Sequence, residues 1–370
     1  MKKLLALLLA GARMFGLVAC GGSGDKGGDA DVEGDGALRV ALVVSALGDK
    51  SFNDSAKEGL DKAVADYGIS LTVKEIGSET EKVAPALIDL SEDGYDVMIF
   101  NNMGFGAGAE WVEANAAKYP DTLYLVYDEV DPDNNYTVDD DLAVTNVQFL
   151  QYKASESDFL AGYLAAKLSE TGIIGFVGGV QGPVIDDFLA GYIQGAKAAK
   201  DDIKVMYAYV GGYTDAPGGK NLGLTQINAG ADVIHAVAGS SGNGALEAAL
   251  EEGKIGIGVD SDQYTVFKGD NDPKAEIVVT SSLKNVGKSL YTVIGELVDG
   301  TFVKQSKRWF GSEEGCAGIA KNENYEKMVS EELRAEMEEV ERKLADGDLV
   351  CVSYFDMDEA QFNALLDSIK

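Results

Sequence analysis

The side chains that could do chemistry in this sequence gather at the ends of predicted β-strands. They comprise two aromatic rings, an amide, several carboxylates and one ammonium group: Phe52, Asn53, Asp54, Asp128, Tyr213, Asp260 and Lys284. In parallel sheets flanked by helices, ligands bind beyond the carboxyl ends of the strands. Each residue alone has an ordinary structural explanation, such as Phe52 packing at the start of a helix. Their shared location predicts a binding site.

The chemistry that these residue types offer is recognition of a polar ring system. Two aromatic rings from opposite sides of a cleft, Phe52 and Tyr213, can stack on both faces of a flat heterocycle. Such stacking contributes about 1–3 kcal/mol per base. Carboxylates accept hydrogen bonds from sugar hydroxyls and ring N–H groups, and a buried partner left unpaired makes such a site selective. We therefore predict a site that binds and does not catalyse.

Three other motifs lack parts that their chemistry requires. Gly287-Lys288-Ser289 has Ser282 where a phosphate-binding loop needs its first glycine. The acidic loop 131–141 has the oxygen spacing of a calcium loop without its central glycine or final glutamate, so a solvated loop and a weak calcium site both stay open. The turn around Gly242 does not follow the dinucleotide-binding pattern, although backbone N–H groups at a helix start can hold a ligand oxygen.

Composition excludes several classes of function. The 31 basic residues against 62 acidic ones give a net charge of −31 at pH 7, which excludes a nucleic-acid-binding surface. One histidine and three cysteines are too few for a His-rich or Cys-rich metal site, and no metal or other cofactor is predicted. His235 falls within an apolar run, which favours a core residue over a catalytic base. Cys316 and Cys351 allow either a disulfide or two buried thiols.

The elements that must position these residues alternate regularly along the chain. Apolar strands are predicted at 38–45, 71–76, 97–101, 122–127, 173–178, 204–210, 233–238, 256–259 and 276–281, and a last one at 349–354. Segments of helical period fall between them at 56–67, 83–91, 107–118, 157–169, 186–199, 219–229, 243–252 and 284–298, with another at 333–344. Nearly continuous apolar strands, each followed by a helix, indicate an α/β fold with two doubly wound parallel sheets and a cleft between them.

The amino terminus has the features of an export signal. Lys2 and Lys3 precede an apolar run at 4–10, and Leu17-Val-Ala-Cys20 resembles the bacterial lipobox, in which the cysteine is lipidated. Residues 21–36 contain Gly, Asp and Ser with almost nothing apolar, as a flexible spacer does. We therefore predict a lipoprotein signal peptide at 1–19, a lipid anchor on Cys20 and a flexible tether at 20–37.

From about residue 38 onward the chain resembles the basic membrane protein family, lipoproteins that bind purine nucleosides for ABC importers. The resemblance is carried, in order, by Gly-Asp-Lys-Ser-Phe-Asn-Asp-Ser at 48–55, Phe-Leu-Ala-Gly-Tyr at 159–163 and again at 188–192, Gly-Phe-Val-Gly-Gly at 175–179, Gly-Asn-Gly at 242–244, Gly-Val-Asp-Ser-Asp at 258–262 and Leu-Lys-Asn-Val at 283–286. It implies a type I periplasmic-binding-protein fold, in which two α/β domains are joined by a hinge.

The resemblance also implies a role for each matching residue. Phe52 stacks on the base, with Asn53 and Asp54 beside it, and Asp128 reads the base. Tyr213 takes the place of a second stacking aromatic, which is usually Phe. Asp260 and Lys284 hold ribose hydroxyls. Gly242, in the glycine turn, is a further ligand-binding position.

The predicted protein is a monomeric, lipid-anchored receptor on the extracytoplasmic face of a bacterial membrane. It captures a purine nucleoside of the guanosine, inosine or adenosine type and passes it to an ABC permease with its ATPase subunits. Domain 1 is predicted at 38–149 plus 258–300 and domain 2 at 150–257 plus 301–370, with the hinge near 147–151, 257–262 and 299–303. The ligand stabilises the closed arrangement because it contacts both domains.

Three alternative functions stay open on the sequence. A sugar or autoinducer receptor has the same shape, and Asp and Asn beside facing aromatic rings also suit sugars. A nucleoside-processing enzyme would use a pair of carboxylates. A signalling or adhesion lipoprotein would use the fold without transport.

Overall fold

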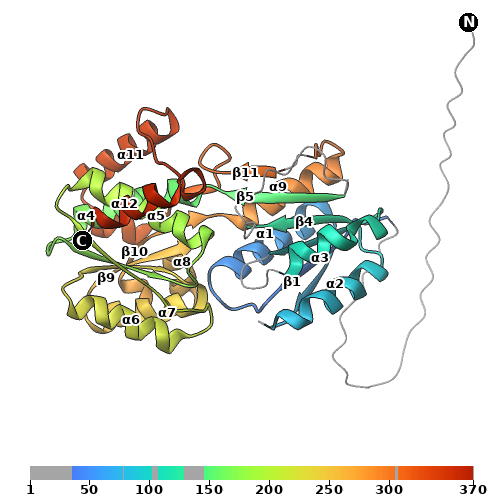
Figure 1. The fold of residues 1–370 in the computed structure, drawn as a ribbon, viewed down its shortest axis with the longest axis horizontal. Coiled ribbons are helices and arrows are strands. Elements are labelled where there is room, and N and C mark those ends of the chain that lie inside the picture. Colours follow the sequence, from blue (N-terminus) through green and yellow to red (C-terminus); the bar gives the residue numbers. More distant parts are fainter. Residues whose placement is uncertain (1–35, 78, 102–106, 129–145, 305–306, 370) are drawn as a thin grey trace, which may run out of the picture. The chain divides into compact units, whose positions relative to one another are not determined.

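The computed structural model describes residues 36–77, 79–101, 107–128, 146–304 and 307–369 (Figure 1). These residues form one compact unit, Gly36–Lys370, that contains two six-stranded sheets. The predicted signal peptide, Cys20 and the acidic loop 131–141 lie outside the described residues, as does nearly all of the tether. Within the described ranges, no helix combines the length and the hydropathy that crossing a membrane requires.

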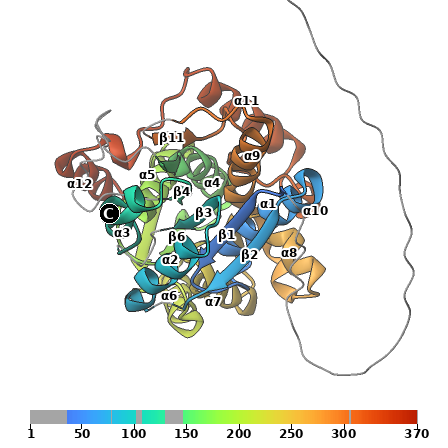
Figure 2. The same ribbon diagram turned by 90° about the vertical axis from the view of Figure 1, so that its right-hand side faces the viewer.

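The first sheet has the strand order β11-β5-β4-β3-β1-β2, and all of its pairings are parallel. Its strands are β1 (Arg39–Val44), β2 (Ser70–Glu75), β3 (Val97–Asn101), β4 (Leu123–Tyr127), β5 (Val147–Tyr152) and β11 (Lys307–Phe310). Helices α1 (Phe52–Tyr67) and α9 (Val286–Asp299) cover one face, and α2 (Val83–Glu92) and α3 (Ala107–Asn115) cover the other (Figure 2). We call this sheet with its helices the first lobe.

Strand β1 shows why these apolar runs form a sheet covered on both sides. Successive side chains of a strand point to opposite faces. Val40, Leu42 and Val44 pack against α1 and α9, whereas Ala41 and Val43 pack against α2 and α3. Both sets are almost fully buried, so neither face of the strand can be polar.

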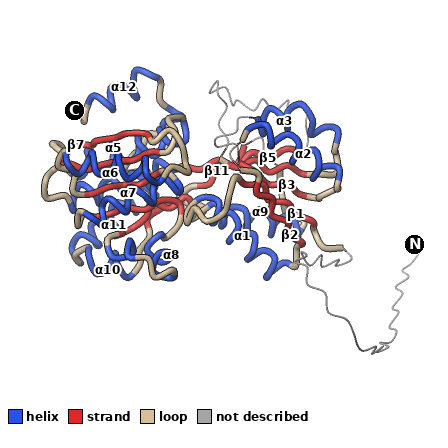
Figure 3. Tube along the Cα trace, turned by 90° about the horizontal axis from the view of Figure 1, so that it is seen from below, coloured by secondary structure: helices blue, strands red, loops and turns tan. Residues whose placement is uncertain are grey.

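The second sheet has the order β12-β10-β9-β8-β6-β7. Its strands are β6 (Ile173–Gly178), β7 (Lys204–Tyr209), β8 (Val233–Val237), β9 (Ile255–Asp260), β10 (Val278–Lys284) and β12 (Ala317–Ile319), of which only β12 runs antiparallel to its neighbour. We call this sheet with its helices the second lobe. Figure 3 shows helices on both sides of each sheet, as the sequence predicts.

The helices of the second lobe divide between the two faces of its sheet (Figure 1). One face packs against α4 (Ala154–Leu168), α5 (Pro183–Ala199), α10 (Glu323–Met328), α11 (Glu331–Ala345) and α12 (Glu359–Asp367). The other packs against α6 (Ala216–Asn228), α7 (Gly239–Glu251) and α8 (Gln263–Gly269). Four short 3₁₀ helices complete the described elements: η1 (Thr80–Lys82), η2 (Ala116–Lys118), η3 (Pro273–Glu276) and η4 (Tyr354–Asp356).

The repeated Phe-Leu-Ala-Gly-Tyr motif is explained by the packing of α4 on α5. Gly162 of α4 lies so close to α5 that a Cβ atom there would sit 2.0 Å from the Tyr192 carbonyl oxygen. Gly191 of α5 would bring a Cβ atom within 2.3 Å of the Ser155 carbonyl oxygen. Only glycine permits this backbone approach, so each copy of the motif supplies one half of a close helix pair.

The chain passes between the lobes three times among the described residues. It leaves β5 of the first sheet for α4, leaves β10 of the second sheet for α9, and leaves β11 for β12. Near the third crossing, the Trp309 ring of β11 lies 5.9 Å from the Phe355 ring of η4, in an edge-to-face contact. These crossings lie at 152–154, 284–286 and 310–317.

The crossings differ from the predicted domain division and hinge. Segment 258–300 was predicted to belong wholly to domain 1, but β9 and β10 pair with each other inside the second sheet. Segment 301–370 was predicted to belong to domain 2, but β11 pairs with β5 in the first sheet. The hinge therefore does not fall at 257–262 or 299–303, and at 147–151 the chain is still in β5. An apolar run predicts a strand but does not say which sheet the strand joins.

Two local predictions also change. The predicted strand at 349–354 is wrong: side chains of α5 take the place of a neighbouring strand there. The Val352 N–H donates to Gln194 Oε1 (3.0 Å), and the Tyr354 N–H donates to Asp187 Oδ1 (2.9 Å). Strand β5 is absent from the predicted elements because Gln148 and Gln151 interrupt its apolar run, although both side chains are buried.

Candidate ligand-binding site

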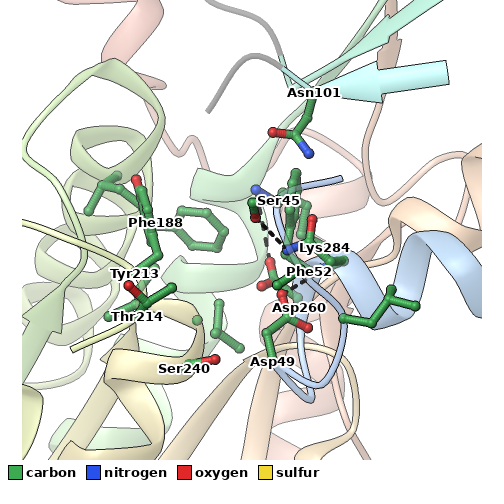
Figure 4. A pocket seen from close by; sticks show the side chains of 18 residues that line it. Ser45, Asp49, Phe52, Asn101, Phe188, Tyr213, Thr214, Ser240, Asp260 and Lys284 are labelled. Atoms are coloured by element: carbon green, nitrogen blue, oxygen red, sulfur yellow. Dashed lines mark hydrogen bonds and ion pairs between the residues drawn. The ribbon is translucent and has the colours of Figure 1, made fainter. Parts of the chain in front are cut away.

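One pocket lies where the carboxyl ends of both sheets face each other (Figure 4). The first lobe contributes the residues that follow β1, the start of α1 and the end of β3. The second lobe contributes part of α5, the residues after β7 and β8, and the ends of β9 and β10. Ligands of doubly wound sheets bind at this edge.

Five of the eight predicted ligand-binding residues line this pocket: Phe52, Asn53, Tyr213, Asp260 and Lys284. Asp128 is buried beside it, and its Oδ2 atom accepts a hydrogen bond from Lys284 Nζ at 2.5 Å. Asp54 and Gly242 do not line the pocket. Asp54 accepts hydrogen bonds from the backbone N–H groups of Gly48 and Lys50, both at 2.8 Å, and Gly242 lies inside α7.

Aromatic rings form much of the wall. Phe52 is 8% exposed, and its ring centroid lies 4.5 Å from Lys284 Nζ. Phe188 of α5 presents its ring from the second lobe, with the same ammonium group 5.0 Å from its centroid. Tyr213 packs against Gly179, where a Cβ atom would lie 2.2 Å from the tyrosine ring, and burial raises the pKa of its phenol. The ammonium group of Lys284 therefore lies near aromatic rings from both lobes.

The polar part of the wall is a buried cluster of charges. Lys284 is 2% exposed and lies 2.5 Å from Asp128 Oδ2 and 3.9 Å from Asp260 Oδ1. Asp260 also accepts a hydrogen bond from the Ser51 hydroxyl. Burial raises the pKa of the Asp260 carboxyl to about 6, although the charge of Lys284 opposes this shift. Removing charged groups from water is costly even when they are paired, so a buried cluster of this kind contributes little to stability.

Asp49 holds the start of α1 in place. Its carboxylate accepts hydrogen bonds from the backbone N–H groups of Ser51 (3.1 Å), Asn53 (2.8 Å) and Asp54 (3.2 Å). Burial raises the pKa of Asp49, and these backbone donors oppose the shift. Together they fix the turn that presents Phe52 and Asn53 to the pocket.

Backbone strain also concentrates at this site. Among the described residues, four non-glycine positions have left-handed backbone, and Lys50 (φ 57°), Asp128 (φ 56°) and Asp260 (φ 63°) are three of them. This conformation is costly for residues with a side chain, and such strain clusters at functional sites. Moreover, the Asn53 Oδ1 atom is buried without a hydrogen-bond partner, which leaves an acceptor for a ligand donor.

Most of the chain matches one family of known proteins. A family model described as "ABC transporter substrate-binding protein PnrA-like" matches residues 38–346. The chain belongs to this family. Members of the PnrA-like family are solute-binding proteins of ABC transporters and act outside the cytoplasm, which implies a ligand and partner permease and ATPase subunits.

Individual relatives agree with the assignment to the PnrA-like family. The chain is 32% identical over 357 residues to "Basic membrane protein A" of Borreliella burgdorferi, covering 95% of this chain and 96% of that protein. It is 27% identical over 368 residues to the "CD4+ T-cell-stimulating antigen" of Listeria innocua, covering 93% and 96%. The match to basic membrane proteins confirms the resemblance found in the sequence motifs.

Solved structures establish the fold. An ABC transporter solute-binding protein from Aeropyrum pernix superimposes with a TM-score of 0.74 at 22% identity, covering 90% of this chain and 98% of that one. One from Conexibacter woesei gives 0.66 at 19% identity, covering 86% and 100%. This PnrA-like chain therefore has the predicted type I periplasmic-binding-protein fold.

The site of this PnrA-like protein includes residues that sequence reasoning did not name. Asn101 ends β3, so it follows the same rule of a polar residue at a strand end and could have been found. Asp49 lies in the same motif as Phe52 but reads as a turn residue. Phe188 gives no signal, because it lies inside an apolar helix and differs from its core neighbours only in its position in space.

His235 is a core residue, as predicted. It is fully buried in β8, and its Nε2 atom lies 3.1 Å from both carboxylate oxygens of Asp158 and 3.4 Å from the Ser282 hydroxyl. In a catalytic triad the acid and the serine contact different ring nitrogens, and the serine is open to substrate. This trio meets neither condition, and no group of three or more His, Cys, Asp or Glu side chains within the described ranges could hold a metal.

Proposed function

We propose that this protein captures a purine nucleoside of the guanosine, inosine or adenosine type and delivers it to an ABC permease. The observation that carries this proposal is the composition of the pocket. Aromatic rings of both lobes stand beside a buried, paired lysine and two carboxylates. A flat base stacks on aromatic rings, and ribose hydroxyls form hydrogen bonds to charged groups.

The base would lie between the rings of the two lobes. Phe52 supplies one face, and Tyr213 with Phe188 supplies the other. Asn53 offers the buried Oδ1 atom that has no partner within the protein. Asp128 would read ring N–H groups, because a carboxylate that bonds one lysine keeps further acceptor sites.

The ribose would lie over the charged cluster. Asp260 accepts hydrogen bonds from the ribose hydroxyls, and Lys284 donates to them. Asp54 and Gly242 would contribute indirectly, Asp54 through the backbone of the loop before α1 and Gly242 through the start of α7. The residues of both lobes close around the ligand by rotation at the three crossings, and no reaction is catalysed.

The rest of the proposal concerns the amino terminus. Residues 1–19 act as a lipoprotein signal peptide, and acyl chains on Cys20 hold the monomeric receptor to the outer face of the membrane through the tether. Removal of residues 1–19 takes away Lys2, Lys3 and Arg13 and no acidic residue, which leaves 28 basic residues against 62 acidic ones. Anionic lipid repels such a protein, so the acyl chains alone would supply the attachment.

A thermal-unfolding screen tests the choice of ligand. Nucleosides, free bases and sugars are added separately, and a ligand present at 100 times its Kd stabilises the protein by about 2.7 kcal/mol. We expect purine nucleosides to raise the melting temperature and ribose or hexoses to leave it unchanged. Stabilisation by a hexose instead would replace the proposal with a sugar receptor, and release of free base during incubation would replace it with an enzyme.

The ribose contact is tested with 2′,3′-dideoxynucleosides. They lack the hydroxyls that would bond Asp260 and Lys284, and a hydrogen bond to a charged group contributes about 1.5–3 kcal/mol. We therefore expect them to bind at least tenfold more weakly than the parent nucleosides in calorimetry, whereas 5′-deoxynucleosides serve as the control. Equal affinity for dideoxy and parent nucleosides would remove both residues from the ribose site.

A further inference from the structure

The loop at 48–51 connects β1 to α1 in the first lobe, yet it forms hydrogen bonds to the second lobe along its length. Three successive backbone carbonyl oxygens each accept a side-chain donor. Asn243 Nδ2 donates to the Asp49 oxygen (3.3 Å), Gln263 Nε2 to the Lys50 oxygen (3.1 Å) and Ser261 Oγ to the Ser51 oxygen (3.4 Å). The second lobe therefore recognises the backbone of this loop.

The side chain of Lys50 extends the same contact. Its Nζ atom lies 2.6 Å from Asp270 Oδ2 and 3.9 Å from Asp272 Oδ2, at the carboxyl end of α8. It also lies 5.4 Å from the Phe267 ring centroid. Lys50 does not line the ligand pocket, so these interactions join the lobes without a ligand atom.

Both partners are also held by hydrogen bonds within their own lobes. Asp54 binds the N–H groups of Gly48 and Lys50, and Asp49 binds those of Ser51 and Asn53, all within the first lobe. Across the contact, Gln263 is 2% exposed, and its Oε1 atom accepts a hydrogen bond from the Val259 N–H. Little conformational entropy is lost when rigid groups pair, so such contacts keep more of their energy.

We propose that the 48–51 loop is an interlobe latch, in which Lys50 and the loop carbonyls stabilise the closed arrangement directly, without the ligand. The proposal rests on the hinge motion in the proposed function but not on the identity of the ligand. When the lobes separate, the three carbonyls and Lys50 return to water. The latch therefore sets how much of the free energy of closure the protein itself supplies.

The latch has a distinct consequence for affinity. A ligand binds more tightly when its binding-competent state is already populated, and this gain is the same for every ligand. Lys50→Ala should therefore weaken the binding of all ligands by one common factor. An exposed ion pair of this kind corresponds to about a twofold to fivefold change in affinity.

The test uses charge reversal in the full-length protein without any ligand. Lys50→Glu places a carboxylate against Asp270 and Asp272, and Lys50→Glu with Asp270→Lys restores an opposite-charge pair. Lys57→Glu is the matched control. This substitution changes the charge by the same amount, but Lys57 pairs with Asp61 within α1 (2.5 Å) and not with the second lobe. Small-angle X-ray scattering measures the radius of gyration of each variant, and circular dichroism checks that each is folded.

We expect Lys50→Glu to have a larger radius of gyration than the parent, Lys57→Glu to match the parent, and the double variant to return toward it. Lys50→Ala, a milder change, should fall between. A parental radius for Lys50→Glu would overturn the latch, and so would equal expansion of Lys57→Glu, which would mean general charge repulsion. If no nucleoside binds, the proposed ligand is wrong, but the test of the latch still stands because the scattering is measured without any ligand.

Discussion

At the scale of single residues, Asp260 combines three conditions that are each costly. It is 6% exposed, its backbone is left-handed, and its carboxylate lies among other charged groups. A left-handed residue with a side chain costs about 1–2 kcal/mol. Glycine at this position would avoid that cost, so an aspartate there is consistent with the proposed role of its carboxylate in the pocket.

The raised pKa of Asp260, about 6, makes the proposed ribose contact sensitive to pH. Ribose hydroxyls donate to the ionised carboxylate, so protonation removes the acceptor and weakens binding. We expect nucleoside Kd values from calorimetry to rise about tenfold from pH 7.5 to pH 5. The stability of the ligand-free protein changes with pH in the opposite direction. Because the pKa of Asp260 lies above its unfolded value of 3.8, ionising this carboxyl lowers the free energy of unfolding as the pH rises.

Two substitutions separate this effect from other titrations. Asp260→Asn should bind more weakly and lose the dependence on pH. Asp187 has a pKa raised to about 6 by burial but lies outside the pocket, so Asp187→Asn should keep the dependence. A Kd that is flat between pH 5 and pH 7.5 in the parent would contradict a role for the Asp260 carboxylate.

Phe52 is the residue that most directly tests the stacking of a base. Phe52→Ala should weaken nucleoside binding by about 1–3 kcal/mol, the contribution of one stacked aromatic ring. Tyr67→Ala is the control, since it removes a ring from the other end of α1 that stacks on Tyr291. If Phe52 only packs the start of its helix, the melting temperature of the ligand-free variant would fall while its nucleoside affinity stayed parental.

Site residues can be predicted from the sequence where a side chain able to bind a ligand stands at a predicted strand end or helix start. Asp260 and Lys284 end β9 and β10, Phe52 begins the helix that follows β1, and all three line the pocket. Phe188 could not be predicted, because its approach to the pocket depends on how α5 packs against α4. The hydrogen bond from Lys284 to Asp128 likewise depends on the meeting of the two lobes, because these residues are 156 positions apart in the chain.

At the scale of elements, the contact between α4 and α5 is set by glycine. Gly162→Ala would place a Cβ atom 2.0 Å from the Tyr192 carbonyl oxygen, so the helices must move apart. Overpacking of this kind costs about 1–3 kcal/mol, and we expect a lower melting temperature and a lower midpoint in urea. Gly269→Ala is the control, because that helical glycine has no neighbour within 4 Å of an added Cβ atom. Parental stability of Gly162→Ala would show that the helices are less tightly packed than described.

The predicted elements are accurate where hydrophobic periodicity is regular and fail where polar groups take over backbone hydrogen bonds. Strand β5 has two buried glutamines within its apolar run, so its hydrophobic pattern is irregular. It forms a strand because β4 and β11 pair with it on either side. In segment 349–354, Gln194 and Asp187 bind the backbone that a strand partner would otherwise bind. Neither arrangement has a local sequence signal.

At the scale of the whole molecule, the proposed anchor gives a prediction about location. Cys20→Ala should move the protein from the membrane fraction to the soluble fraction without changing its nucleoside affinity, because acyl chains would be its only attachment. Cys351→Ala is the control, since that thiol packs within the second lobe and should leave the distribution unchanged. A Cys20→Ala protein that still sediments with membranes would rule out the lipid anchor.

The edge-to-face contact of Trp309 with Phe355 gives the chain an optical reporter of its own. The sequence has only two tryptophans, and Trp111 is buried in the core of the first lobe. Trp309 belongs to the first sheet but meets a ring of the second lobe, beside the third crossing. Rotation of one lobe against the other changes the surroundings of this indole alone. Its emission intensity and wavelength should therefore follow opening and closing in real time, so that stopped-flow fluorescence can time the capture of a ligand without any dye.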